Sequence, residues 1–197
     1  LDVVYVEQPE PLGLGHAIHI TAQHVTGPVF ILLGDTILSG DLKRFVEFRD
    51  DCIGVKEVED PRRFGVVEIR NGFITRITEK PEHPASNTVV VGAYSFRDSS
   101  RLYAALHSLI DSGKTTRGEI QLTDAIEKLI LQKHRIRTVK IAGWHDCGKP
   151  ATLLATNRFL LDTHKHSAKR AGCLIIPPAY IAPDTKIEHS VIGPYVS

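Results

Sequence analysis

The apolar positions near the start of the chain form two continuous runs separated by a segment with a different spacing. The runs DVVYV (2–6) and PVFILL (28–33) are typical of buried strands. Between them, GLGHAIHITAQHV (13–25) has the composition and length of a helix. A strand, a helix and a second strand in this order predict a βαβ unit with a parallel sheet.

The middle of the chain alternates between short strand patterns and helical patterns. Asn71-Gly72 lies between two of the strand patterns and is a strong hairpin signal. Apolar residues recur on one face of a segment near 99–113, as in a helix that covers a core. Further strands are predicted at 52–58, 64–70, 73–80, 88–96 and 138–144, and helices at 41–49 (with Asp41 as N-cap), 99–113, 122–134 and 151–165. The fold class is therefore α/β with an inserted antiparallel part.

The tail that begins at Pro177 has another period. Aliphatic residues recur at Ile181, Ile187 and Ile192 with small or turn residues between them. This spacing is close to the hexapeptide period of a parallel β-helix, of which about two rungs would be present. An irregular proline-rich tail is the alternative interpretation.

Composition and charge narrow the possible functions. The 197 residues have a formal net charge of +1, which gives no reason to expect nucleic acid or an anionic membrane as a partner. No apolar run approaches the roughly 20 residues that a membrane-spanning helix needs. The three cysteines are far apart and have no metal-ligand spacing, which favours a cytoplasmic protein. Because the chain has no Met and opens inside a predicted strand, we expect it to be a fragment.

Two aspartates follow apolar strand patterns. Asp35 ends the run VFILLGD, and Asp146 follows the strand pattern TVKIAGW. If both lie at the carboxyl edge of the sheet, they could share one hard cation such as Mg²⁺, with phosphate oxygens completing the shell. Two unrelated turn or cap aspartates would give the same pattern.

The segment EQPEPLGLGHA (7–17) joins the first strand pattern to the first helix pattern. Its glycines would allow a ligand to approach the backbone, and Gln8 could offer both a donor and an acceptor to a base edge. A plain strand-to-helix turn is an equally good reading.

A third candidate site lies in TEKP, where Glu79 could accept hydrogen bonds from sugar hydroxyls and Lys80 could hold a phosphate. An exposed pair in a loop is the alternative. Gly65 in RFGVVE is either a ligand-facing glycine or a bulge. In GEIQLTDAI, Thr123 is expected to cap a helix.

Seven blocks, in this order and spacing, resemble the sugar-1-phosphate nucleotidyltransferases, which make nucleoside-diphosphate sugars. The blocks are QPEPLGLGHA, LLGDTIL, DPRRFGVVEI, ITEKPEHPASN, VVGAYSF, GEIQLTDAI and GWHDCGKP. The resemblance covers nearly all of residues 3–160. The tail resembles the left-handed β-helix of the long forms of this family.

The resemblance implies a Rossmann-like nucleotidyltransferase domain over residues 1–166, with a linker and the first rungs of a left-handed parallel β-helix over 167–197. It also assigns roles to residues. Nucleotide-binding positions would be Gln8, Pro11, Gly13 and Gly34; sugar-phosphate positions would be Gly65, Glu79, Lys80 and Gly92; Asp35 and Asp146 would hold Mg²⁺; and Lys80, Asp35 and Asp146 would be catalytic.

The implied reaction joins a sugar-1-phosphate, expected to be glucose-1-phosphate, to the α-phosphate of dTTP or UTP and releases pyrophosphate. Relatives commonly assemble as homo-oligomers. The Gly-x-Gly-Thr-Arg loop and the Pro-Lys segment of the family are absent from this chain, so we expect the chain alone to have little or no activity. A non-catalytic nucleotide-sugar-binding subunit and a bifunctional nucleotidyltransferase/acyltransferase are the alternatives.

Overall fold

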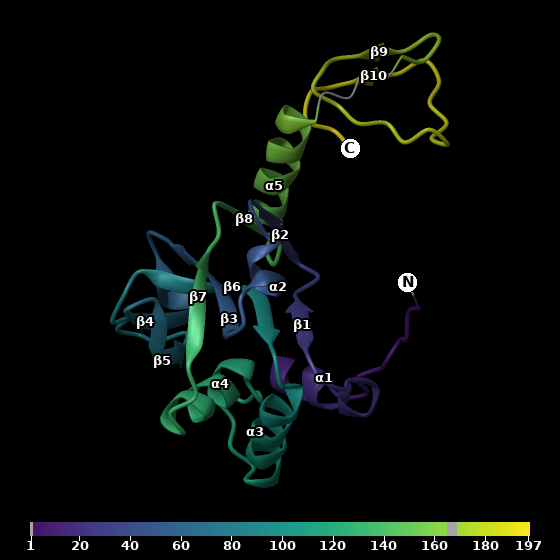
Figure 1. Ribbon diagram of the computed structural model, residues 1–197. Helices are drawn as coiled ribbons and strands as arrows, with labels where there is room; N and C mark the ends of the chain where they lie inside the picture. Colours follow the sequence, from purple (N-terminus) through teal and green to yellow (C-terminus); the bar gives the residue numbers. More distant parts are fainter. Residues whose placement is uncertain (1, 165–168) are drawn as a thin grey trace. The chain divides into compact units, whose positions relative to one another are not determined.

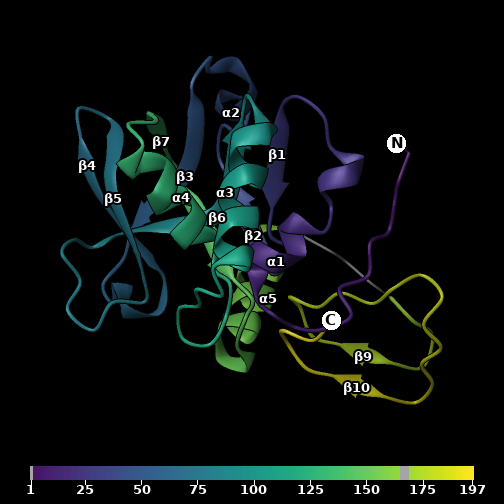
Figure 2. The ribbon, with the colours of Figure 1, turned by 90° about the horizontal axis from the view of Figure 1, so that it is seen from below.

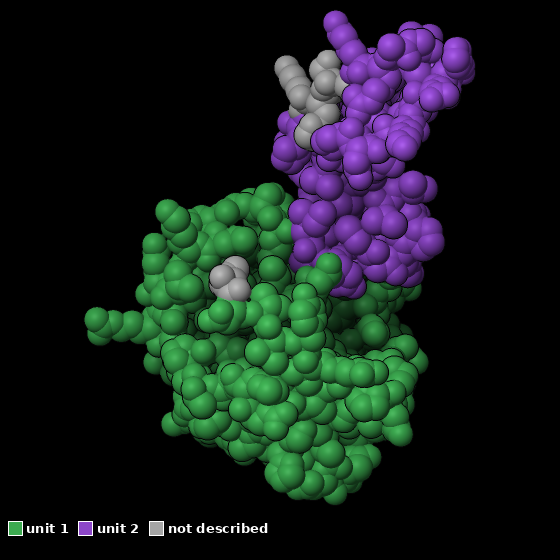
Figure 3. Space-filling view, turned by 90° about the vertical axis from the view of Figure 1, so that its right-hand side faces the viewer, with its two compact units in different colours: residues 1–34, 38–144 green, residues 35–37, 145–197 purple. Residues whose placement is uncertain are grey.

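The computed structural model describes residues 2–164 and 169–197. The described chain divides into two compact units, coloured separately in Figure 3. Unit 1 comprises residues 1–34 and 38–144, and unit 2 comprises residues 35–37 and 145–197. Within the described residues, no helix is long and apolar enough to cross a membrane.

Unit 1 is built on a six-stranded sheet with the order β1-β6-β3-β7-β5-β4 (Figure 1). β3 and β7 pair in parallel, whereas β1 with β6, β3 with β6, β4 with β5 and β5 with β7 are antiparallel. The sheet is therefore mixed. Its strands are β1 (Val29–Leu32), β3 (Asp51–Glu57), β4 (Gly65–Arg70), β5 (Phe73–Glu79), β6 (Thr88–Phe96) and β7 (Ile136–Lys140).

The predicted parallel βαβ unit is wrong in this structure. Residues 2–6 form no strand, and the side chains of Val3, Val4 and Tyr5 are 65%, 63% and 93% exposed. These residues have strand-forming side chains, but no neighbouring strand supplies hydrogen-bond partners for their backbone. The helix predicted at 13–25 is shorter, with α1 at Leu14–His19 and the 3₁₀ turn η1 at Ala22–His24.

The Asn71-Gly72 hairpin is confirmed. Both residues have positive φ angles, 53° and 78°, and Arg70 pairs with Phe73 directly across the turn. Two consecutive residues in the left-handed region match the twist of the flanking strands, and Asn and Gly reach that region at low cost. The turn sets the pairing of the residues next to it, and a register shift between Glu68 and Ile69 then places Gly65 opposite Glu79.

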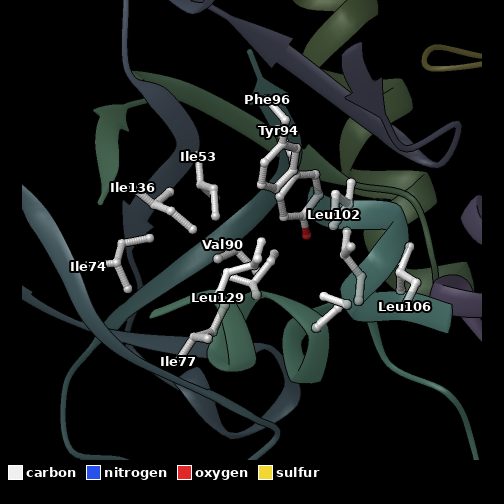
Figure 4. Packing of buried hydrophobic residues seen from close by; sticks show 14 of the residues in the cluster. Ile53, Ile74, Ile77, Val90, Tyr94, Phe96, Leu102, Leu106, Leu129 and Ile136 are labelled. Carbon is white, nitrogen blue, oxygen red and sulfur yellow. The ribbon is translucent and has the colours of Figure 1, made fainter. Parts of the chain in front are cut away.

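Helices α3 (Ser99–Asp111) and α4 (Leu122–Leu131) cover one face of the sheet (Figure 2). Side chains from β3, β5, β6 and β7 meet those of the two helices in a single apolar cluster (Figure 4). The predicted apolar face of α3 is confirmed, because Leu102, Leu106 and Leu109 are all buried. β6 contributes Val90, Tyr94 and Phe96 to this cluster.

The opposite face of the sheet carries a smaller cluster. Alternation along β6 sends Val91 and Ala93 to this side, where they meet Phe45 of α2 (Arg44–Glu47). Gly54 lies under the same ring, since a Cβ there would come within 3.1 Å of Phe45. The helix predicted at 41–49 is reduced to one turn, and its N-cap is Lys43. Asp41 instead accepts a hydrogen bond from the Lys43 amide.

The strand predicted at 138–144 is divided into two. β7 ends at Lys140, and β8 (Gly143–Asp146) pairs with β2 (Thr36–Ser39) in a separate two-stranded sheet. The two parts pair with different strands: β7 lies between β3 and β5, whereas β8 pairs with β2. There Gly143 lies so close to Ser39 that a Cβ would come within 1.8 Å of the Ser39 hydroxyl. The apolar pattern is continuous across the break, so no local pattern indicates it.

In unit 2, helix α5 (Pro150–Thr163) matches the prediction up to residue 163. His164 is its C-cap and is not helical, and residue 165 lies outside the described residues. The tail contains β9 (Leu174–Ile175) and β10 (Val191–Ile192), which pair in parallel, and a parallel bridge between Ala179 and Val196. One short pair and one bridge do not define a β-helix, which stays a prediction. The assignment of domains at residue 166 also stays a prediction.

All three cysteines are free. Cys52 is fully buried in β3, and burial raises the pKa of its thiol to about 11. Its thiolate is therefore scarce at neutral pH, so Cys52 is a packing residue rather than a nucleophile.

The α3–sheet interface predicts a large difference between two leucines. Leu106→Ala should lower the free energy of unfolding by about 2–5 kcal/mol, because Leu106 is fully buried and the cavity left behind cannot collapse completely. Leu131→Ala is the matched control: this leucine is 73% exposed and should change stability by less than about 0.5 kcal/mol. Urea denaturation of both variants is the measurement, and equal effects would contradict the packing described above.

Candidate functional site

The loop before α1 is fastened to the segment that precedes α4. The amide of Gly15 donates to the carbonyl of Ile120, and the amide of Ile120 donates to the carbonyl of Leu12, both at 2.8 Å. Gly13 has a φ of 108°, and a Cβ there would lie 2.7 Å from the Ile120 carbonyl oxygen. Glycine is therefore required at position 13 by conformation and by space.

Gln8 is oriented by two contacts. Its Nε2 lies 3.2 Å from the Gly13 carbonyl oxygen and 3.0 Å from Nδ1 of His16. Both N–H groups of the amide are thus used inside the protein. Among the described residues none donates a hydrogen bond to Oε1 of Gln8, so this oxygen is the group that can accept one from a ligand.

Glu79, at the end of β5, is nearly buried, with 9% of its side chain exposed. Its Oε2 accepts a hydrogen bond of 2.9 Å from the Thr123 hydroxyl in the first turn of α4. Gly65, its partner across β4 and β5, leaves room for this contact. A Cβ on Gly65 would lie 2.9 Å from the Thr123 methyl and 3.3 Å from Oε2 of Glu79.

Lys80 follows Glu79 in a conformation that lysine seldom adopts, with a φ of 41°. The backbone is held there from both sides: the Lys80 amide donates to the Phe64 carbonyl at 3.0 Å, and Nη2 of Arg117 donates to the Lys80 carbonyl at 2.8 Å. Nζ of Lys80 lies 3.5 Å from Oε1 of Glu79. The result is a carboxylate and an ammonium side by side, with the guanidinium of Arg117 close to the same backbone.

The charge of Glu79 also affects the pKa of a neighbouring phenol, that of Tyr94. Tyr94 of β6 is buried, and burial together with the negative charge of Glu79 raises the pKa of Tyr94. The phenol therefore stays protonated at neutral pH, where it can only be a neutral donor or acceptor.

Three positions expected to bind ligands, Gly92, Pro11 and Gly34, differ in their surroundings. Gly92 packs against a side chain of the protein, whereas the other two are exposed. Gly92 has a φ of 77°, and its Cα faces Leu33, whose side chain would lie 3.0 Å from a Cβ. Pro11 and Gly34 are exposed, and a Cβ on Gly34 would meet open space. Gly92 thus has a packing reason to be glycine, whereas the surroundings of Gly34 leave it accessible.

Unit 2 brings together the two aspartates. The Cys147 amide donates to the Asp35 carbonyl at 2.8 Å, and the Gly148 amide donates to Oδ1 of Asp146 at 3.0 Å. A Cβ on Gly148 would lie 3.1 Å from Oδ1 of Asp146 and 3.5 Å from Oδ2 of Asp35. Both carboxylates therefore border the same small space, which the missing side chain of Gly148 leaves open.

The donor set at this space suits a hard divalent cation. Two carboxylate oxygens from different chain segments are the ligands that Mg²⁺ uses when water and phosphate oxygens fill its other positions. Within the described residues, no group of three or more His, Cys, Asp or Glu side chains could hold a metal. The pair is therefore an incomplete shell that would need oxygen ligands from elsewhere.

Sequence reasoning missed two residues of the site in unit 1. Thr123 does not cap a helix: the N-cap of α4 is Gln121, and the Thr123 hydroxyl bonds to Glu79 instead. Arg117 was not predicted, because a lone arginine in a loop belongs to no recognisable sequence pattern. A contact between residues 44 positions apart in the chain gives no local signal.

Comparison with known proteins gives consistent results. A profile of the nucleotidyl transferase family matches residues 1–163. The chain is 33% identical to the glucose-1-phosphate thymidylyltransferase of Streptomyces antibioticus, across 100% of this chain and 62% of that protein. It is 35% identical to the bifunctional protein GlmU of Methanococcus aeolicus, across 85% of this chain and 40% of that protein. The chain thus spans less than two thirds of the length of either relative.

A solved structure of a UDP-glucose pyrophosphorylase complexed with UDP-glucose superimposes with a TM-score of 0.70 at 24% identity. The alignment covers 82% of this chain and 66% of the other. At this identity the likeness shows the fold alone, which is the Rossmann-like α/β fold of nucleotidyltransferases.

The Thr123–Glu79 contact predicts the behaviour of two threonine variants. Thr123→Val keeps the shape but leaves a nearly buried carboxylate oxygen without its donor, so it should lower the free energy of unfolding by about 1–3 kcal/mol. Thr123→Ser keeps the hydroxyl and should lose less. Chemical denaturation compares the two, and a valine variant as stable as wild type would remove the hydrogen bond from this account.

Proposed function

The chain belongs to the nucleotidyl transferase family, and we propose that the complete protein transfers a nucleotidyl group from dTTP or UTP to glucose-1-phosphate, giving a nucleoside-diphosphate sugar and pyrophosphate. The observation that carries the proposal is the fixed pair of Glu79 and Lys80. A carboxylate beside an ammonium matches a ligand that has hydroxyl groups at one end and a phosphate at the other.

The two residues of the pair would bind different parts of a sugar phosphate. Glu79 has Oε2 occupied by Thr123, which leaves lone pairs to accept hydrogen bonds from sugar hydroxyls. Lys80 places a point charge for the phosphate, and Arg117 brings a second cation close to it. Because the Glu79 carboxylate and the Lys80 backbone are held by hydrogen bonds before a ligand arrives, less ordering is needed on binding.

The orientation of Gln8 supports a preference for uracil or thymine. Its free acceptor Oε1 suits the N3–H that both bases carry, and cytosine lacks a hydrogen at that position. Gly13, which admits no side chain, and the neighbouring Pro11 would form the rest of the base-binding loop. Gly34, accessible before Asp35, would border the nucleotide.

Asp35 and Asp146 would hold Mg²⁺, and the open space beside Gly148 fits this role. A bound cation would neutralise negative charge on the triphosphate. The sugar phosphate is already anionic and needs no general base, so the protein groups act by orienting it in line with the α-phosphorus and by offsetting its charge. Lys80 and Arg117 are the cations of this chain that we assign to that task.

We extend the proposal to the organisation of the protein. Residues 1–166 would form the nucleotidyltransferase domain, and 167–197 a linker and the first rungs of a left-handed β-helix, which the parallel pairing of β9 with β10 supports. Three free cysteines favour the cytoplasm. Assembly as a homo-oligomer is part of the same proposal.

The test is pyrophosphate release by the product of the complete gene, with glucose-1-phosphate, Mg²⁺ and either dTTP or UTP. Wild-type protein should turn over, and Asp146→Asn should lower kcat by roughly 100-fold or more because one metal ligand loses its charge.

Asp162→Asn is the matched control, because Asp162 is an exposed carboxylate on α5 of the same unit. It should retain wild-type turnover. Wild-type turnover in Asp146→Asn would reject the metal pair, and absence of release from the wild-type protein would reject the activity and favour a nucleotide-sugar-binding subunit.

A further inference from the structure

Unit 1 has a cavity of about 510 Å³, and eight of its eleven lining residues are charged. It lies where β3 begins and β6 ends, between the start of α3 and the end of α4. Five of its lining residues are cations: Arg49, Arg97, Arg101, Lys133 and Arg135. β6 runs from Gly92 toward this cavity, so roughly 17 Å of strand separates it from the Gly92 region.

The three carboxylates in the wall already have partners. Asp50 accepts two hydrogen bonds, of 2.9 and 2.7 Å, from Arg137, which is not part of the wall. Asp51 is 7% exposed and accepts from the Arg97 amide and from Nε2 of His134, both at 2.6 Å. Asp98 caps α3 through Ser100.

Two of the cations are fixed in place. The guanidinium of Arg97 donates to the carbonyls of Phe45 and Val46 in α2 and of Phe48, its C-cap. Arg101 donates from Nη1 to Nδ1 of His134 at 3.3 Å, and Nε2 of His134 then donates to Asp51. This chain of contacts makes one wall of the cavity rigid.

The remaining three cations have no anionic partner. Among the described residues, none offers a carboxylate to Arg49, Lys133 or Arg135; Arg135 lies over the ring of Phe73, 4.0 Å from its centroid. The chain as a whole has a net charge of only +1, so this excess is a local feature. Positive charges gathered without counterions repel one another, and an anion in the cavity would relieve the repulsion.

We propose that this cavity binds a diphosphate group. A diphosphate carries several negative charges spread over two phosphorus centres, so it matches a lining with three unpaired cations better than a single carboxylate does. Both products of the proposed reaction, pyrophosphate and the nucleoside-diphosphate sugar, carry this group, and the choice of these two sources rests on the proposed function. The lining of the cavity includes neither Glu79 nor Lys80, so the proposed site is separate from that pair.

Equilibrium dialysis with labelled pyrophosphate, without Mg²⁺, tests the proposal on the product of the complete gene. The variant Arg49→Ala/Lys133→Ala should weaken binding roughly tenfold or more, because two charged contacts are lost. Arg70→Ala/Lys140→Ala removes two exposed cations outside the cavity and should leave binding unchanged.

Lys80→Ala separates this inference from the proposed function. If the cavity is the site, Lys80→Ala still binds pyrophosphate. The proposal would be overturned if Lys80→Ala lost pyrophosphate binding while Arg49→Ala/Lys133→Ala kept it. It would also be overturned if wild-type protein bound no pyrophosphate at a millimolar concentration of this ligand. Because dialysis needs no turnover, the result can be read even if pyrophosphate release fails. Equilibrium dialysis of Lys80→Ala with labelled UDP-glucose then shows whether the cavity also binds the diphosphate group of a sugar nucleotide.

Discussion

The hydrogen bond from Thr123 to Glu79 is the contact on which the candidate sugar-phosphate site depends. It joins the end of β5 to the first turn of α4 and fixes a carboxylate that is almost out of contact with water. A buried carboxylate without donors would be costly, so the threonine both stabilises the fold and orients Glu79. Gly65 makes the contact possible by having no side chain between them.

Lys80 depends on the same arrangement. A left-handed conformation costs a non-glycine residue about 1 kcal/mol or more, and here backbone hydrogen bonds from Arg117 and to Phe64 hold it. β5 ends before this residue, and Nζ of Lys80 lies 3.5 Å from Oε1 of Glu79. The core cluster beneath, with Tyr94 buried next to Glu79, supplies the low-polarity surroundings in which the charges act strongly.

Sequence patterns predicted an element correctly where neighbouring residues alone determine its structure. The Asn71-Gly72 turn and the strand β6 were predicted correctly, because turn chemistry and a continuous apolar run need no distant partner. Residues 2–6 have an equally strong strand pattern and form none, since a strand exists only when another pairs with it. β8 is separate from β7 because it pairs with β2, and the Ser39–Gly143 contact in this pair joins residues about a hundred positions apart.

In the candidate site, too, residues with a local sequence signal were predicted and residues that depend on distant contacts were not. Glu79, Lys80, Asp35 and Asp146 were singled out because charges after strand patterns are visible in a sequence, and the structure pairs Glu79 with Lys80 and Asp35 with Asp146. The role of Thr123 was assigned wrongly, because its partner is distant in the chain and a helix start is the obvious local reading. The excess of cations around the charged cavity is equally hidden, since three segments contribute to it.

The most direct test of the account is steady-state kinetics of Glu79→Gln in the complete protein, with Glu82→Gln, an exposed carboxylate in the following loop, as the control. If Glu79 accepts the sugar hydroxyls, its variant should raise KM for glucose-1-phosphate roughly tenfold or more and leave KM for the nucleoside triphosphate unchanged. Unchanged KM values for both substrates, or an equal rise in both, would contradict the assignment of Glu79 to the sugar.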